Sequence, residues 1–187
     1  LIPMMFPDYR RVDNAEASEF FSKYWRTELD PNPGLTVVEI MDKAYEGEIR
    51  GMYIMGENPA MSDPDLNHSR AGLVALDHLV LQDIFLTETA AFADVLLPAS
   101  AFPEKTGTFS NTDRRVQVGR KALDCPGEAR RDLWIIQELA NRLGLDWNYP
   151  EAKDVFEEMR GAMPSSGGMT WERLEPQHSI TYPCEGA

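Results

Sequence analysis

Three short polar segments carry the residues whose types could do chemistry. In Gly56-Glu57-Asn58-Pro59, the glycine lets the backbone approach a ligand closely and the asparagine offers an amide donor and an acceptor. In Gln82-Asp83, the carboxylate can accept hydrogen bonds from a ribose or a base. The segment from Glu104 to Arg115 contains Lys105, which can bind a phosphate as a point charge. These groups predict ligand binding, because no nucleophile with a paired base and no metal-ligand spacing accompanies them.

Each of these features also has an ordinary structural interpretation. Gly56 to Pro59 could be a common strand-to-helix turn, and Asp83 could cap the next short helix. The loop from Glu104 to Arg115 could be an exposed segment with surface charges, and Asp132 has the position of a helix N-cap. The glycine pattern is not GxGxxG, so a nicotinamide cofactor is not indicated for this segment.

Helices alternate with short apolar strands in the first two thirds of the chain. Thr36 and Glu39 have capping-box spacing at the start of one helix, and a further helix begins at Asp132. Strands are predicted at residues 52–55, 78–82 and 95–97, with a helix from Ser62 or Asp63 to about Leu76 and helical turns over 87–92. This alternation predicts an α/β fold with a short, mostly parallel sheet covered by helices on both faces. Ligands bind such sheets beyond the carboxyl ends of the strands, where the polar segments fall.

The remaining parts of the chain are less regular. Residues 1–35 are expected to form an N-terminal arm and a helix that starts at Asp13 or Asn14. Residues 36–163 are expected to form the α/β domain, in which 102–118 is an irregular loop that ends in a short extended segment, 115–118. Residues 164–187 are expected to be an irregular tail, because Pro176 and Pro183 disfavour an internal strand.

Composition limits the function classes. The chain has 187 residues and a formal net charge of −13, which disfavours nucleic acid as a partner because such affinity comes mainly from basic groups. No apolar run approaches the roughly 20 residues of a membrane span. Because the chain starts at Leu1, we expect it to be a processed chain or a piece of a longer protein.

Four segments together resemble the molybdopterin oxidoreductase family. They are MGENPA at 55–60, QDIFLTETA at 82–90, ADVLLP at 93–98 and EKTGTFSNTDRRVQ at 104–117. The flanking segments 4–9, 29–36 and 170–183 are most similar to alpha subunits of soluble NAD-dependent formate dehydrogenases. The resemblance implies one Rossmann-like, three-layer domain of a much larger subunit, which holds part of a molybdopterin guanine dinucleotide carrying molybdenum or tungsten.

The resemblance also implies which residues bind the dinucleotide. In related nitrate reductases the contacts fall on positions that match Asn58, Gln82, Asp83, Lys105 and Asp132, and Gly56 and Glu57 adjoin them on the turn. Asp83 would accept hydrogen bonds from a ribose or guanine, Asp132 from guanine, and Lys105 would bind the pyrophosphate or nearby polar groups.

The family's metal-ligating Cys or selenocysteine, its nearby His and Arg, and its iron–sulfur motifs have no match here. The resemblance therefore implies that this chain alone is inactive, and that the remaining domains of the alpha subunit complete the enzyme. It also implies a cytoplasmic enzyme in which electrons pass through iron–sulfur clusters to flavin- and iron–sulfur-containing subunits that reduce NAD. The alternatives are a nitrate reductase or another family member, a metal-free complex I-type relative, and a free-standing nucleotide-binding protein.

Overall fold

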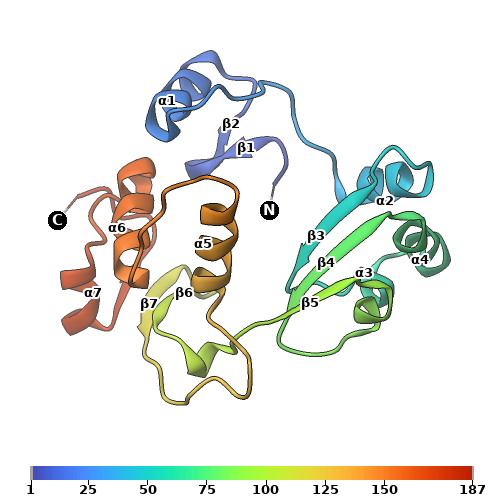
Figure 1. Ribbon diagram of the computed structural model, residues 1–187. Helices are drawn as coiled ribbons and strands as arrows, with labels where there is room; N and C mark the ends of the chain where they lie inside the picture. Colours follow the sequence, from blue (N-terminus) through green and yellow to red (C-terminus); the bar gives the residue numbers. More distant parts are fainter. Residues whose placement is uncertain (1, 187) are drawn as a thin grey trace. The chain divides into compact units, whose positions relative to one another are not determined.

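The computed structural model describes residues 2–186 and divides the chain into two compact units (Figure 1). We call Leu35–Glu104 with Leu123–Leu145 the parallel unit. Leu1–Gly34, Lys105–Ala122 and Asp146–Ala187 form the antiparallel unit. This division differs from the consecutive segments 1–35, 36–163 and 164–187 expected from sequence. The chain leaves the parallel unit after Glu104 and returns at Leu123, so each unit is assembled from separated segments.

The parallel unit is built on a three-stranded sheet in which all strands are parallel. Its order is β3 (Gly51–Met55), β4 (His78–Asp83) and β5 (Val95–Pro98). The helical elements are α2 (Val37–Tyr45), α3 (Pro59–Ser62), α4 (Leu66–Ala75), η2 (Glu88–Phe92), η3 (Phe102–Glu104) and α5 (Asp132–Arg142). The predicted α/β fold with a parallel sheet flanked by helices is confirmed.

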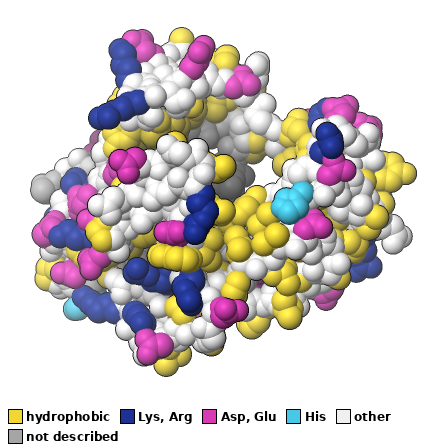
Figure 2. Space-filling model, viewed as in Figure 1, with side chains coloured by type: hydrophobic (Ala, Val, Ile, Leu, Met, Phe, Trp, Pro, Cys, Tyr) yellow, Lys and Arg dark blue, Asp and Glu magenta, His cyan; other side chains and the backbone are white. Residues whose placement is uncertain are grey.

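Successive side chains along the strands alternate between the two faces of the sheet, and one of these faces forms the hydrophobic core. Ile54, Leu79 and Leu81 are buried together with Met41 of α2 and Leu73 of α4. In Figure 1, α2 and α4 lie on one side of the sheet and α5 lies on the other. The capping box at Thr36 and Glu39 is present, which explains why α2 begins where its sequence predicts. Hydrophobic side chains also reach the surface of this unit (Figure 2).

The helix after β3 starts differently from the sequence prediction. A short helix, α3, begins at Pro59 and ends at Ser62, and α4 begins only at Leu66. The N-cap of α4 is Asp65, whose side chain accepts a hydrogen bond from the backbone N–H of His68 at 3.1 Å. The predicted start at Ser62 or Asp63 is therefore wrong, because Asp65 satisfies the first turn instead.

The antiparallel unit has two small sheets. One pairs β1 (Met5–Phe6) with β2 (Arg10–Arg11), and the other has the order β6 (Gly107–Ser110), β7 (Arg115–Gly119), β8 (Ser179–Thr181). Its helical elements are η1 (Pro7–Tyr9), α1 (Ala15–Trp25), α6 (Ala152–Ala162), η4 (Pro164–Ser166) and α7 (Trp171–Gln177). The cap of α1 is Asn14, as the sequence allowed.

Two predicted irregular regions are regular in this unit. Part of the expected loop 102–118 forms the β6–β7 hairpin, whose turn is closed by a hydrogen bond from Asn111 N–H to the Arg115 carbonyl. The expected irregular tail contains α7 and β8. Since β8 pairs only with β7 and lies at the sheet edge, Pro183 beyond its end does not interrupt the ladder.

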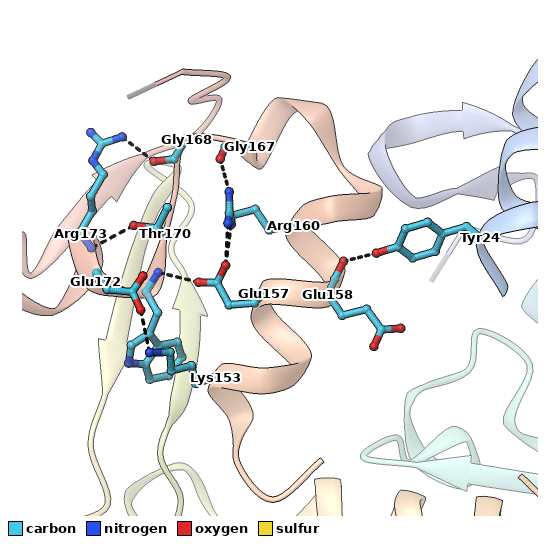
Figure 3. Close-up of polar contacts among 11 residues, drawn as sticks. Tyr24, Lys153, Glu157, Glu158, Arg160, Gly167, Gly168, Thr170, Glu172 and Arg173 are labelled. Atoms are coloured by element: carbon cyan, nitrogen blue, oxygen red, sulfur yellow. Dashed lines mark hydrogen bonds and ion pairs between the residues drawn. The ribbon is translucent and has the colours of Figure 1, made fainter. Parts of the chain in front are cut away.

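Polar contacts connect α6 to α7 and α1 within the antiparallel unit (Figure 3). Glu157 pairs with Arg160 at 2.6 Å and accepts a hydrogen bond from the backbone N–H of Trp171 at 2.9 Å. The Tyr24 hydroxyl donates to the backbone carbonyl of Glu158 at 2.7 Å. The Glu157–Arg160 pair lies within α6, whereas the contacts with Trp171 and Tyr24 join α6 to separate helices and stabilise the unit's tertiary packing.

We expect the phenol of Tyr149 to titrate well above an ordinary tyrosine. Its hydroxyl donates to a carboxylate oxygen of Glu158 at 2.5 Å; this hydrogen bond, then burial and nearby negative charge, raises the pKa of Tyr149 to about 12. Because the pKa of Tyr149 is raised in the folded protein, its hydrogen bond to Glu158 stabilises the folded state below about pH 10. This contribution to the free energy of unfolding is lost as pH rises through about 12.

Ultraviolet titration of phenolate, compared with Tyr149→Phe to identify the signal, measures this pKa. Glu158→Gln is expected to shift the Tyr149 signal down towards 10. An unshifted signal in Glu158→Gln would show that Glu158 is not the cause.

Candidate functional site

The carboxyl ends of the strands bring two of the predicted site segments, 56–59 and 82–83, to one edge of the parallel sheet. Gly56 follows β3, and its N–H donates to the backbone carbonyl of Gln82 in β4 at 2.9 Å. The backbone carbonyl of Asp83 accepts from Ala99 N–H at 3.0 Å, just beyond β5. The loops after all three strands therefore start at the same level of the sheet.

The side chain of Gln82, at the end of β4, is buried and connects two other residues; only 1% of its surface is exposed. Its Oε1 accepts a hydrogen bond from the Tyr53 hydroxyl, and its Nε2 donates to Oδ1 of Asp132 at 2.8 Å. Burial, and then the negative charge of Asp132, raise the pKa of Tyr53, which favours the protonated hydroxyl. The side chain of Gln82 thus joins β3, β4 and α5.

Asn58 connects the loop after β3 to the helical turn after β4. Its Oδ1 accepts from both the N–H and the hydroxyl of Thr89, at 3.1 and 2.8 Å. Its Nδ2 donates to Glu88 at 2.7 Å, and this hydrogen bond is the main cause of a pKa of Glu88 below the ordinary value. Asn58 therefore fixes the shape of two loops at the site, a role that its spacing did not reveal.

Neither Asp83 nor Asp132 is the N-cap of a helix, although the sequence allowed that structural role for both. Asp83 Oδ1 accepts from Phe85 N–H at 3.1 Å and so closes the turn directly after β4, before η2 begins. Asp132 is the first residue of α5, whose N-cap is Arg131. The N-cap prediction for Asp132 is wrong, because Arg131 has the extended backbone of the cap and Asp132 is already helical; the Asp132 carboxylate accepts from Gln82.

The other predicted residues occupy the turn or the second unit. Gly56 has a φ of +66°, and a Cβ built there would meet nothing within 4 Å, so the backbone at this point is open to a ligand. Glu57 is exposed beside it. Lys105 belongs to the antiparallel unit, where it begins the segment Lys105–Ala122. All the other predicted site residues belong to the parallel unit.

Sequence reasoning missed Tyr53 and Glu88. Alternation with buried Ile54 could have placed Tyr53 on the face of the sheet opposite the α2–α4 core, but no local pattern reveals its contact with Gln82. Glu88 lies next to Thr87 and Thr89 in a segment interpreted only as helical turns.

The arrangement fits the polar tail of a nucleotide. It combines an open glycine turn, exposed and half-buried carboxylates, and amides fixed by internal hydrogen bonds. Carboxylates accept from guanine N–H groups and from ribose hydroxyls. Within residues 2–186, no group of three or more His, Cys, Asp or Glu side chains converges as a metal site would require. Across the same residues, no helix has the length and apolar character needed to cross a membrane.

The chain belongs to the molybdopterin oxidoreductase family, whose sequence model matches residues 12–142. A solved structure of acetylene hydratase from Pelobacter acetylenicus superposes with a TM-score of 0.63 and 22% identity, covering 78% of this chain and 20% of that one. This second similarity supports the fold alone.

Similar proteins include several alpha subunits. The chain is 48% identical to the F420-dependent formate dehydrogenase subunit alpha of Methanocaldococcus jannaschii, covering 98% of this chain and 27% of that protein. It is 44% identical to the F420-dependent formate dehydrogenase 1 subunit alpha of Methanococcus maripaludis, with the same coverage. It is 41% identical to a putative formate dehydrogenase of Bacillus subtilis, YrhE, covering 97% of this chain and 18% of that protein. The chain thus spans about a quarter or less of the length of these relatives.

Proposed function

We propose that the chain is a cofactor-binding part of a formate dehydrogenase alpha subunit. In this proposal it binds the guanine dinucleotide portion of a molybdopterin cofactor. The main support is the position of Gln82 and Asp83 at the carboxyl end of β4. A hydrogen bond from Gln82 places Asp132 at the same end of the sheet. The similarity to named formate dehydrogenases favours formate over nitrate as the substrate of the whole enzyme.

Each site residue has a distinct role in this proposal. Gly56 and Glu57 form the open turn against which the dinucleotide lies, and Asn58 holds that turn in place. Asp83 accepts from the ribose or guanine and Asp132 accepts from guanine. Lys105, in the antiparallel unit, binds a phosphate as a point charge. When bound, the cofactor supplies molybdenum or tungsten for a two-electron oxidation of formate to carbon dioxide. The residues of this chain bind and orient its nucleotide end.

The partners are the rest of the alpha subunit and an electron-accepting system. Ile84, Phe85 and Leu86 follow Asp83 directly, and Phe85 and Leu86 are 72% and 82% exposed. An apolar loop of this kind beside a ligand site is suited to contact with other domains of the subunit. We favour F420 over NAD as the final acceptor, because the two archaeal relatives are named F420-dependent. We further propose that the electrons pass through iron–sulfur clusters outside this chain and that the enzyme is cytoplasmic.

Asp83→Ala in the full-length subunit is expected to weaken dinucleotide binding about tenfold, the effect of losing a hydrogen bond to a charged acceptor. Metal by mass spectrometry and guanine nucleotide by chromatography, both per subunit, measure the loss. Asp77→Ala, just before the start of the same strand, is the control because it removes the same atoms away from the site. Equal cofactor content in the two variants would show that Asp83 does not bind the dinucleotide.

Formate oxidation by the wild-type holoenzyme, assayed with F420 and with NAD, tests the activity and the acceptor. We expect formate-dependent reduction of F420. Absence of formate oxidation by a holoenzyme with full metal content would exclude the proposed substrate.

A further inference from the structure

Tyr53 lies beside the proposed dinucleotide site, although neither spacing nor resemblance assigned it a role. In the β3–β4 ladder, Met55 is opposite Gln82, and Tyr53 is two residues before Met55. Residues two apart on a strand project from the same face, so Tyr53 and Gln82 share the face opposite the α2–α4 core. The Tyr53 hydroxyl donates to Oε1 of Gln82 across this face.

The Gln82 amide lies between the Tyr53 hydroxyl and the Asp132 carboxylate, and the carboxylate decides which way the amide points. The oxygen of an amide only accepts hydrogen bonds and its nitrogen only donates them. Because the carboxylate only accepts, Nε2 faces Oδ1 of Asp132 at 2.8 Å, and the Tyr53 hydroxyl donates to Oε1 and anchors the other end of the amide. If the amide were rotated by half a turn, its oxygen would face the Asp132 carboxylate, and two acceptors would meet without a proton.

We propose that Tyr53 and Gln82 form a positioning chain that holds the Asp132 carboxylate in place to accept hydrogen bonds from guanine. This inference rests on the proposed function and assigns Gln82 an indirect role in it. Gln82 is almost fully buried, so its bond to Asp132 is shielded from water, and breaking it leaves a buried polar group unpaired. A carboxylate offers about four acceptor positions, so contact with Gln82 is compatible with contact to a base.

The ionisation of Tyr53 is consistent with this chain. Burial and the nearby Asp132 carboxylate raise the pKa of Tyr53 above its ordinary value. The raised pKa favours the protonated hydroxyl, which is the form that donates to Oε1 of Gln82.

The first test is Tyr53→Phe in the full-length subunit, with Tyr45→Phe as the matched control. Tyr45 lies on α2 in the same unit, where its side chain is exposed, and the substitution removes the same oxygen. We expect Tyr53→Phe to lose metal and guanine nucleotide about 3- to 10-fold faster than the control during dialysis, which corresponds to one hydrogen bond. The cofactor-free Tyr53→Phe variant is also expected to melt below the control, because it leaves the buried Oε1 of Gln82 without a donor, so the second test separates positioning from stability.

The second test reverses the polarity of the inner hydrogen bond. Gln82→Glu alone puts two carboxylates together and is expected to lower the melting temperature of the cofactor-free subunit and its nucleotide content. Adding Asp132→Asn restores a hydrogen bond, because the new amide donates to the new carboxylate. We expect the double variant to regain stability but to retain as little nucleotide as Asp132→Asn alone. A purely structural role predicts that nucleotide content returns with stability.

The outcomes separate the two proposals. If Asp132→Ala leaves the nucleotide content unchanged, the proposed site is wrong. If Asp132→Ala loses nucleotide while Tyr53→Phe behaves like Tyr45→Phe, the site stands and the positioning chain is overturned. Recovery of full nucleotide content in the double variant would also overturn it.

Discussion

Asp132→Ala is expected to lower the affinity of the full-length subunit for its guanine dinucleotide by about 10- to 100-fold. A hydrogen bond to a charged acceptor contributes about 1.5–3 kcal/mol, which corresponds to this range. The substitution also leaves the buried Nε2 of Gln82 without its carboxylate partner. Guanine nucleotide and metal retained per subunit after dialysis measure the effect.

Glu138→Ala is the matched control for this prediction. Glu138 is a carboxylate on the same helix, α5, where it pairs with Arg142 at 2.6 Å. We expect the control to retain the wild-type amount of nucleotide, because that ion pair lies on the exposed part of the helix. Similar losses in both variants would mean that Asp132 acts through the stability of α5 and not through contact with the base.

Leu81→Ala is expected to destabilise the parallel unit by about 3 kcal/mol, the usual cost of a cavity in a packed core. Leu81 is at the centre of β4 and is 1% exposed, in a cluster with Met41, Ile54 and Leu73. Because the chain has two units, the measurement must report on this one. Hydrogen exchange of the β4 amides, followed by mass spectrometry on this chain, provides that local free energy.

Leu96→Ala is the control in the same row of the sheet. Leu96 is opposite Leu81 in the β4–β5 register, but it lies on an edge strand and is 44% exposed. Its truncation is expected to cost less than about 1 kcal/mol, because much of the side chain already contacts water. Equal protection losses in the two variants would contradict the placement of the core at the central strand β4 and not at the edge strand β5.

The elements of the parallel unit were predictable because their signals are local. The capping box at Thr36 and Glu39 and the apolar strands around Ile54 and Leu81 each lie within a few residues. The antiparallel sheet was not predictable in the same way. β7 pairs with β8 through Arg115 and Thr181, which are far apart in the chain, and no local pattern encodes that pairing.

The candidate site was predictable in its location but only partly in its contacts. The rule that ligands bind at the carboxyl ends of parallel strands selected the segments containing Gly56 and Asp83. The partners of Asn58 and Gln82 were not predictable, since Thr89 and Asp132 reach them only through the packing of neighbouring loops and α5.

The sequence by itself determined the order and type of the elements around the parallel sheet, and its motifs identified the family. Periodicity, caps and turn residues act within one or two turns of chain, so they can be recognised without the fold. Only the tertiary structure decided that the chain divides into two interleaved units, and that Tyr53, Gln82 and Asp132 form one hydrogen-bonded chain. The physical reason is that strand pairing and the direction of a buried amide depend on groups that folding brings together from distant positions.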